Sequence, residues 1–136
     1  MKKVFLDTNI MLDLLGKRYP YFDAIAKIAT LAVRGDLLLV VSALSYSTVD
    51  YVLEKTEKHE DVIYNLQKFK MISTVSDLND AVIEKALNSD FEDFEDALQY
   101  FCALQSKTEV ILTRNSKDFK LSTIPTMTAD EFLKVI

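Results

Sequence analysis

The chain has 136 residues, of which 49% are apolar, enough for one domain with a core of its own. The formal net charge of −5 argues against binding nucleic acid over a broad surface, because phosphate contacts come from lysine and arginine. The single cysteine, Cys102, excludes an internal disulfide and a zinc site built from several cysteines. No apolar run approaches the roughly 18 residues of a membrane helix, and no signal peptide is visible, so we expect a soluble, cytoplasmic protein.

Short apolar and β-branched runs alternate along the chain with longer segments in which apolar residues recur every three or four positions. The first pattern predicts strands and the second predicts helices. In chain order, the predicted elements are a strand at residues 4–6, helices at 9–15 and 21–33, a strand at 37–41, helices at 45–56 and 60–70, a strand at 71–74, helices at 76–88 and 92–106, a strand at 110–113, a weaker strand at 125–127 and a last helix that begins near Thr128.

Residues at the ends of the predicted helices support these boundaries. Gly16 and Gly35 follow the first two helices, at the position where a left-handed residue often ends a helix. Thr128 and Glu131 have the spacing of a capping box, in which each residue satisfies a backbone N–H group at the start of a helix.

The order of strands and helices predicts an α/β fold: a single domain, residues 1–136, with a mostly parallel sheet and helices on both faces. The apolar run at 37–41 does not alternate with polar residues, as expected of a strand that is covered on both sides. Such sheets bind ligands beyond the carboxyl ends of their strands, close to the point where the strand order reverses. Asp7 ends the first strand, and Thr113, Arg114 and Asn115 end the fourth, so they share one crevice if these strands are neighbours.

Five carboxylates fall within seven positions near the start of the penultimate predicted helix: Asp90, Glu92, Asp93, Glu95 and Asp96. Asp93 and Asp96 lie on one helix face, which predicts a Mg²⁺ or Mn²⁺ site if Asp7 joins them. Charge runs are more often solvated surface, and acids in a first turn complement the helix dipole. The dipole, with Asp90 or Ser89 as N-cap, explains Asp90 and Glu92 well, but it explains Asp96 poorly, because we expect Asp96 in the second turn.

Four sequence motifs, in this order, resemble the PIN domain family. They are VFLDTNI at residues 4–10, VSALS at 41–45, DFEDALQY at 93–100 and TRNSKDF at 113–119. The resemblance covers nearly the whole chain and implies a three-layer α/β/α fold. It also implies a metal-dependent endoribonuclease that cleaves RNA phosphodiester bonds, as VapC-type toxins of toxin–antitoxin pairs do. A cognate antitoxin and a second copy of the chain, in a homodimer, are the protein partners that the resemblance suggests.

The resemblance assigns the candidate site residue by residue. Asp7 matches the first acid of the family, Asp96 the third and Asn115 the fourth position, so these three are the candidate catalytic residues. Asp93 and Asp118 are candidate metal ligands beside Asp7 and Asp96. Such a site would hold one or two hard cations, which polarise the phosphate and lower the pKa of an attacking water.

Arg114 and Asn9 are the candidate substrate-binding residues. Arg114 directly follows the fourth predicted strand, at the rim of the crevice, where a guanidinium group can contact phosphate. Asn9 belongs to the first motif, two residues after Asp7. An acidic chain depends on such local contacts, because it cannot hold RNA by a broad positive surface.

The sequence departs from the family at one position. Many PIN domains have a glutamate on the helix after the second strand, and Thr48 occupies that position here. The nearest acid, Asp50, lies about 200° further around a helix and cannot simply replace it. A second hypothesis is therefore a catalytically weakened PIN domain that binds RNA or protein without cutting. A signalling receiver is a third, but it needs an aspartate at the end of its third strand, where residues 73–76 read STVS.

Overall fold

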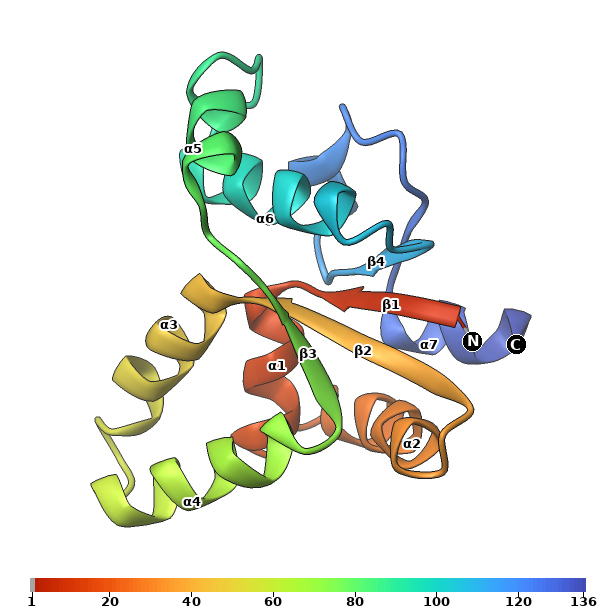
Figure 1. Ribbon diagram of the computed structural model, residues 1–136. Helices are drawn as coiled ribbons and strands as arrows, with labels where there is room; N and C mark the ends of the chain where they lie inside the picture. The colour runs from red at the N-terminus through yellow and green to blue at the C-terminus, as the bar shows by residue number, and fades with distance from the viewer. Residues whose placement is uncertain (1) are drawn as a thin grey trace.

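Five parallel strands form one sheet in the computed structural model, which describes residues 2–136 (Figure 1). The strands are β1 (Lys2–Leu6), β2 (Leu37–Ser42), β3 (Ser73–Ser76), β4 (Val110–Leu112) and β5 (Thr126–Met127). Their order across the sheet is β3-β2-β1-β4-β5, and every neighbouring pair is parallel. The predicted α/β fold with a parallel sheet is confirmed.

The central strand, β1, pairs with β2 on one side and with β4 on the other, so that Val4 stands opposite both Leu39 and Val110. The chain adds β2 and β3 on one side of β1 before it crosses over to add β4 and β5 on the other. The strand order therefore reverses at β1. Because β1 and β4 are neighbours, their carboxyl ends meet at the crevice that the sequence predicts.

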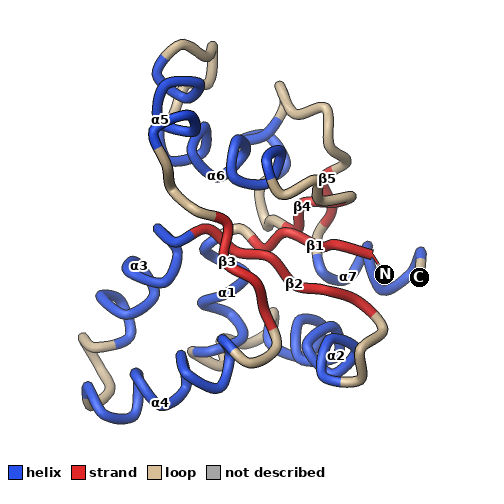
Figure 2. Tube along the Cα trace, viewed as in Figure 1, coloured by secondary structure: helices blue, strands red, loops and turns tan. Residues whose placement is uncertain are grey.

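Within residues 2–136, seven α-helices and one short 3₁₀-helix cover the two faces of the sheet (Figure 2). They are α1 (Thr8–Leu15), α2 (Phe22–Val33), α3 (Ala43–Leu53), α4 (His59–Lys70), α5 (Asp80–Leu87), α6 (Phe94–Gln105), η1 (Ser116–Phe119) and α7 (Ala129–Val135). Helices α1, α2, α3, α4 and α7 pack on one face, and α5, α6 and η1 pack on the other. None of these helices has both the length and the apolar character that crossing a membrane requires.

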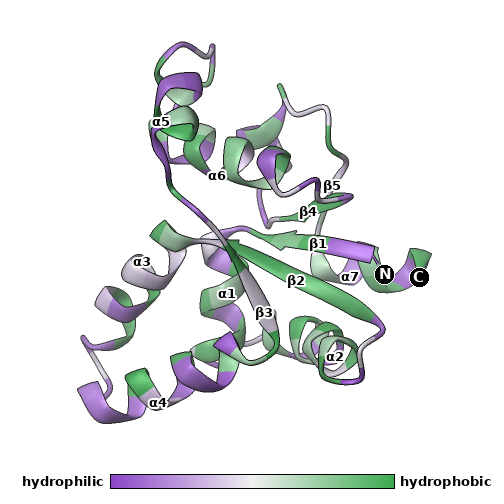
Figure 3. Cartoon of the chain, in the orientation of Figure 1, coloured by the Kyte–Doolittle hydropathy of each residue, from purple (hydrophilic) through white to green (hydrophobic). Residues whose placement is uncertain are grey.

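Two apolar cores fill the spaces between the sheet and its helices. In β1, Val4 and Leu6 face the core on the α1 side, whereas Phe5 faces the core on the α6 side. Leu39 and Val40 of β2 are divided between the two cores in the same way. Most of β2 is hydrophobic along its length (Figure 3). Burial on both faces explains why these strands show no alternation of apolar and polar residues.

The boundary between α4, β3 and α5 differs from the prediction. Met71 ends α4 as its C-cap, so the strand predicted at 71–74 begins at Ser73 instead. The strand extends through Ser76, which was predicted to begin the following helix. That helix, α5, begins later because the Asn79 side chain caps it, accepting a hydrogen bond of 3.0 Å from a backbone N–H of its first turn.

The residues at the helix ends are only partly as predicted. Gly35 is left-handed, with φ of 81°, but Gly16 is not, and Lys17 after it takes the left-handed conformation instead. Gly16 is needed for space, because a Cβ there would lie 2.9 Å from the Leu12 carbonyl oxygen. The capping box at the start of α7 is confirmed: Thr128 and the glutamate three residues later satisfy each other's backbone N–H groups.

The two cores predict the effect of truncating leucine at two positions. Leu39 in β2 is fully buried (0% exposed), whereas Leu87 at the end of α5 is 67% exposed. We expect Leu39→Ala to lower the free energy of unfolding by about 2–5 kcal/mol, because it removes packed atoms and leaves a cavity. Leu87→Ala should change it by less than about 0.5 kcal/mol. Urea denaturation of both variants measures the difference, and equal losses would contradict the placement of Leu39 in the core.

Candidate active site

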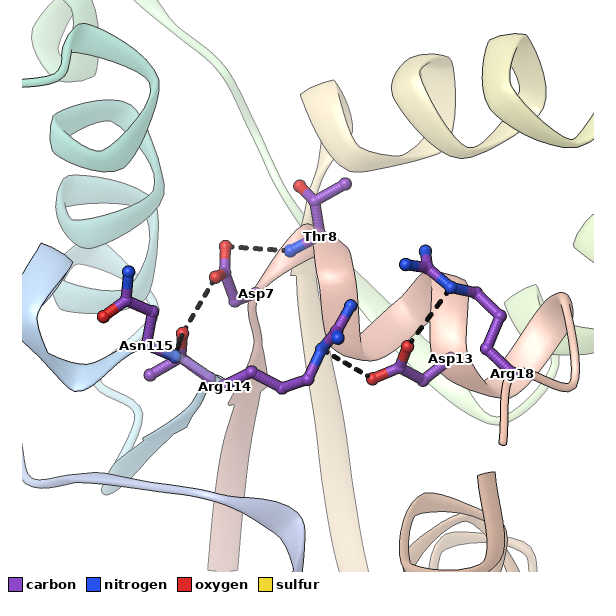
Figure 4. Close-up of polar contacts among 7 residues, drawn as sticks. Asp7, Thr8, Asp13, Arg18, Arg114 and Asn115 are labelled. Atoms are coloured by element: carbon purple, nitrogen blue, oxygen red, sulfur yellow. Dashed lines mark hydrogen bonds and ion pairs between the residues drawn. The ribbon is translucent and has the colours of Figure 1, made fainter. Parts of the chain in front are cut away.

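Asp7 connects the central strand to the first helix and to β4 (Figure 4). It directly follows β1 and is the N-cap of α1, where its Oδ1 accepts a hydrogen bond of 2.9 Å from the Thr8 N–H. Its Oδ2 accepts a hydrogen bond of 3.0 Å from the Thr113 hydroxyl. The residue is only 8% exposed. Both carboxylate oxygens are therefore fixed at the edge where β1 and β4 end.

The environment of Asp7 disfavours its ionised form. Burial raises the pKa of Asp7, and the nearby carboxylate of Asp118 raises it further. The hydrogen bonds from Thr113 and Thr8 and the positive charge of Arg114 lower the pKa but do not offset burial. A buried acid with a raised pKa at the end of a strand is a candidate functional group.

Asp96 on α6 lies near Asp7, because Gln99, one turn further along α6, donates a hydrogen bond of 2.6 Å to the side chain of Thr8, which directly follows Asp7. Burial raises the pKa of Asp96 to about 7, and the negative charges of Asp118, Asp93 and Asp7 contribute to the rise. These carboxylates come from the end of β1, the start of α6 and η1, so segments far apart in the sequence concentrate negative charge at one place. The fold thus brings Asp96 close enough to Asp7 for their negative charges to interact.

The start of α6 differs from the prediction. The helix begins at Phe94, and its N-cap is Asp93 rather than Asp90 or Ser89. The Asp93 carboxylate accepts a hydrogen bond of 3.1 Å from the Asp96 N–H. Asp96 therefore lies in the first turn, where the helix dipole favours its negative charge. The expectation that Asp96 lies beyond the reach of the dipole is wrong, and Asp93 has a capping role in addition to its charge.

Asn115 and Asp118 complete the acidic crevice on the β4 side. The Asn115 Nδ2 donates a hydrogen bond of 3.1 Å to Asp118 Oδ1, and its backbone N–H donates one of 3.2 Å to the Thr113 hydroxyl oxygen. The same hydroxyl donates to Asp7. The Asn115 amide thus orients Asp118, whose charge acts on both Asp7 and Asp96.

The four aspartates form a donor set that suits a hard divalent cation. Within residues 2–136, no three of Asp7, Asp93, Asp96 and Asp118 bring ligand atoms within 4.8 Å of one another. The four side chains are therefore more widely spaced than a preformed site of three protein ligands requires, although Mg²⁺ is commonly bound through only one or two carboxylates and several waters. A cation at this place would also relieve the repulsion that raises the pKa of Asp96.

A neutral hydrogen-bond network lies beside the acids, and the motifs do not predict it. The Gln99 Nε2 donates hydrogen bonds to Thr8 Oγ1 (2.6 Å) and to Ser45 Oγ (3.0 Å). The Ser45 hydroxyl also contacts Thr8 (2.8 Å) and Ser42 (3.2 Å). The sequence signal for Gln99 is its position three residues after Asp96, on the same face of α6.

Residues 3–117 of the chain match the sequence model of the PIN domain. The chain belongs to the PIN domain family. It is 28% identical over 136 residues to Ribonuclease VapC1 of Aquifex aeolicus (strain VF5), a match that covers 96% of this chain and 93% of the relative. The resemblance that the four motifs indicate is thereby confirmed.

Solved structures share the fold over nearly the whole length of this PIN domain. VapBC2 from Rickettsia felis, bound to a promoter DNA fragment, has a TM-score of 0.70 at 18% identity, covering 93% of this chain and 98% of the matched chain. A toxin–antitoxin complex from Klebsiella pneumoniae has a TM-score of 0.67 at 20% identity, covering 93% and 97%. VapC20 of Mycobacterium tuberculosis, a toxin that cleaves the sarcin-ricin loop, has a TM-score of 0.67 at 12% identity, covering 87% and 94%. These similarities confirm the three-layer α/β/α fold.

Thr48 is the residue that the motifs predict at the position where many PIN domains have a glutamate. It is half-buried in α3, one turn after Ser45. Residues three apart lie on the same side of a helix, so Thr48 follows Ser45 on the side that contacts Gln99. Neutral residues therefore occupy the α3 side of the site in this PIN domain.

Asp50 lies elsewhere, in a group with Glu54 and His59 whose ligand atoms are within 4.8 Å of one another. His59 Nδ1 and Glu54 Oε2 are 2.9 Å apart, and this contact raises the pKa of His59. The group joins the end of α3 to the start of α4, and that end of α3 points away from the sheet (Figure 1). Asp50 therefore does not take the place of the missing glutamate.

The two candidate substrate-binding residues belong to the segments that follow β1 and β4. Asn9 is exposed in the first turn of α1. Arg114 follows Thr113, and its side chain turns toward Asp13 of α1, with Nε 3.2 Å from Oδ2 (Figure 4). Asp13 is a buried acid that no motif indicates.

The raised pKa of Asp96 predicts how stability depends on pH when metal ions are removed. Its ordinary value of 3.8 rises to about 7 on folding, so at intermediate pH the folded chain holds a proton that the unfolded chain releases. The stabilisation from this proton is complete below about pH 4 and is lost as the pH rises through about 7. The stability of Asp96→Asn, which cannot ionise, should therefore rise relative to that of the parent protein as the pH increases from about 4 to above about 7.

Thermal unfolding in EDTA, at a pH below 4 and at a pH above 7, measures this difference. Asp36→Asn is the matched control, because Asp36 is an exposed acid that pairs with Arg34 at the surface (3.7 Å). Its effect on stability is the reference for removing an exposed carboxylate outside the site. If Asp96→Asn differs from the parent protein by the same amount at both pH values, the pKa of Asp96 is not raised.

Proposed function

We propose that this PIN domain is the toxin of a toxin–antitoxin pair and acts as a Mg²⁺- or Mn²⁺-dependent endoribonuclease. One observation carries the proposal: α6 packs against the end of β1, where Gln99 donates to Thr8 (2.6 Å), so that Asp7 and Asp96, far apart in the sequence, lie near each other and their charges interact. Family membership and a relative named as a ribonuclease support the nuclease activity. The toxin–antitoxin complex of similar fold supports the role as a toxin.

The chain's own contribution to cleavage is to hold and orient carboxylates. Asp7 and Asp96, with Asp93 and Asp118, would bind the cation through oxygen atoms. Bound divalent ions polarise a scissile phosphate and lower the pKa of an attacking water. Hydrogen bonds fix both oxygens of Asp7, and Asn115 orients Asp118. Asp96 must release its proton to bind a cation, so protons and metal ions compete for the crevice.

RNA would approach the acids past Arg114 and Asn9 at the rim. These local contacts suit a chain whose net charge of −5 opposes broad attraction of phosphate. A cognate antitoxin as partner, a homodimeric state and a cytoplasmic location belong to the same proposal. The solved VapBC2 structure and the toxin–antitoxin complex, which have a similar fold, support an antitoxin as the partner.

A catalytically weakened PIN domain that binds RNA or protein without cutting is the second candidate. Thr48 and the network around Gln99 support it, because they are neutral groups beside the predicted position of the carboxylate that many PIN domains have. With one ligand fewer, the crevice would bind a cation less tightly. The two candidates differ in cleavage rate and in metal affinity.

The nuclease proposal predicts metal-dependent cleavage that needs both acids. Asp7→Asn and Asp96→Asn should each slow cleavage of a labelled RNA by more than about 100-fold, because metal ligation contributes several kcal/mol to the transition state. Asparagine is as good an N-cap as aspartate, so Asp7→Asn should keep the start of α1. EDTA should abolish the parent activity, and Asp36→Asn should leave it unchanged. Cleavage by either site variant at the parental rate would overturn the assignment.

Thr48→Glu tests the second candidate. If the α3 side faces the cation, the added carboxylate should tighten Mn²⁺ binding by about tenfold, since ligand charge sets the affinity of such sites. Thr48→Gln adds the same length without charge and should not tighten binding. Isothermal titration calorimetry measures both affinities. Equal affinities for Thr48→Glu and the parent protein would place Thr48 outside the metal centre and remove the reason for the second candidate.

A further inference from the structure

Asp13 on α1 is a buried acid close to the crevice, with 1% of its side chain exposed. Its carboxylate faces two arginines: Arg114 Nε lies 3.2 Å from Oδ2, and Arg18 Nε lies 3.6 Å from Oδ1 (Figure 4). Neither oxygen has a hydrogen-bond partner within the described part of the chain. A buried carboxylate is costly unless positive charge compensates it. The two arginines supply that positive charge, and the buried carboxylate in turn holds their guanidinium groups at this place.

Arg114 is held from two directions. Asp13 contacts the Nε edge of its guanidinium group, and the Tyr21 ring lies against its face, with 4.1 Å between the guanidinium carbon and the ring centre. The side chain of Arg114 nevertheless remains 25% exposed. It directly follows Thr113, whose hydroxyl binds Asp7. A fixed and partly exposed cation thus lies at the border of the acidic crevice.

A pocket of about 440 Å³ opens beside this arginine. Its walls combine apolar side chains such as Ile10 with the ring of Tyr21, the side chains of Arg114 and Asn115, and two acids, Asp13 and Asp130. The volume lies in the range of about 300–1,000 Å³ that is typical of small-ligand sites. Asn115 also belongs to the acidic crevice, because its side-chain amide donates a hydrogen bond to Asp118 in η1. The pocket and the crevice are therefore adjacent.

The lining of the pocket matches the chemistry of a nucleotide. Unpaired bases in RNA stack on aromatic rings and on arginine side chains, and apolar walls accept the faces of the base. A guanidinium group at the mouth of the pocket can donate two hydrogen bonds to a phosphate, and holding it in place beforehand lowers the entropy cost of binding. Tyr21 and Arg114 supply both features.

We propose that this pocket binds the nucleoside next to the scissile phosphate of single-stranded RNA, with Arg114 contacting the adjoining phosphate and Asp13 acting as the positioning residue for Arg114. The inference rests on the proposed function, because it takes RNA as the ligand of the neighbouring crevice. It adds a binding subsite and assigns Asp13 and Tyr21 to it.

In this proposal the negative charge of Asp13 assists the binding of an anion, RNA. Simple electrostatic repulsion predicts the opposite effect. If Asp13 acted only through its charge, Asp13→Asn would tighten RNA binding, because it removes repulsion. If Asp13 holds Arg114 in place, Asp13→Asn weakens binding. The sign of the change therefore decides between the two.

The test measures binding of a fluorescent single-stranded RNA by anisotropy, at several salt concentrations, in the non-cleaving Asp7→Asn background with Mg²⁺ present. Arg114→Ala should weaken binding by about tenfold or more and lower the salt slope by about 0.7, the value of one phosphate contact in a single strand. Asp13→Asn should weaken binding, but not further when Arg114 is already alanine. Tyr21→Leu should weaken binding, and Tyr21→Phe, which keeps the ring, should not.

Asp36→Asn is the matched control, since it also removes one aspartate that pairs with an arginine, at the exposed surface (3.7 Å). It should not weaken RNA binding. If Asp13→Asn fails to fold, as judged by its thermal unfolding, the salt slope of Arg114→Ala and the two Tyr21 variants decide.

Several outcomes would overturn the subsite. They are tighter RNA binding by Asp13→Asn, a further weakening of RNA binding by Asp13→Asn when Arg114 is already alanine, and an unchanged salt slope for Arg114→Ala. RNA binding that none of the pocket variants alters would mean that the pocket serves another ligand, such as a protein side chain, while the nuclease proposal would still stand. A parent protein that neither binds nor cleaves RNA would overturn both.

Discussion

The pairing of β1 with β4 is the constraint on which the site depends. The backbone N–H of Asp7 donates to the Leu112 carbonyl (3.0 Å), which fixes the residue after β1 against the end of β4. That register puts the Asp7 carboxylate within reach of the Thr113 hydroxyl. It also brings Arg114 and Asn115 to the same edge of the sheet. One reversal of strand order thus gathers residues from both ends of the chain at a single place.

Charge is distributed unevenly around that edge. The charged neighbours that shift the pKa of Asp96 are all negative, whereas Arg114, at the same edge, is paired with Asp13. The side chains of the described residues therefore leave the crevice with an excess of negative charge, and they keep a fixed positive group just outside it. A cation inside and a phosphate at the border would complete this pattern, since each meets the opposite charge.

The sequence alone is informative where a residue's structure depends on its neighbours along the chain. The apolar runs predict β1 and β2 well because burial on both faces leaves a clear pattern, and the motifs point to Asp7 and Asp96. The N-cap of α6 is harder to predict, because several suitable residues precede the helix and only the fold selects Asp93. The pairing of Asp13 with Arg114 has no local signal at all, since it arises from the packing of α1 beside the loop after β4.

The sheet ends in a short strand on each side. β5 has two residues and β3 has four, so the outer backbone of the sheet offers few free N–H and C=O groups. Long open edges invite another chain to add a strand and begin aggregation, and short edges limit this route. The faces of the sheet are covered by helices as well. Association of this fold with another polypeptide is therefore left to the outer surfaces of its helices rather than to extension of the sheet.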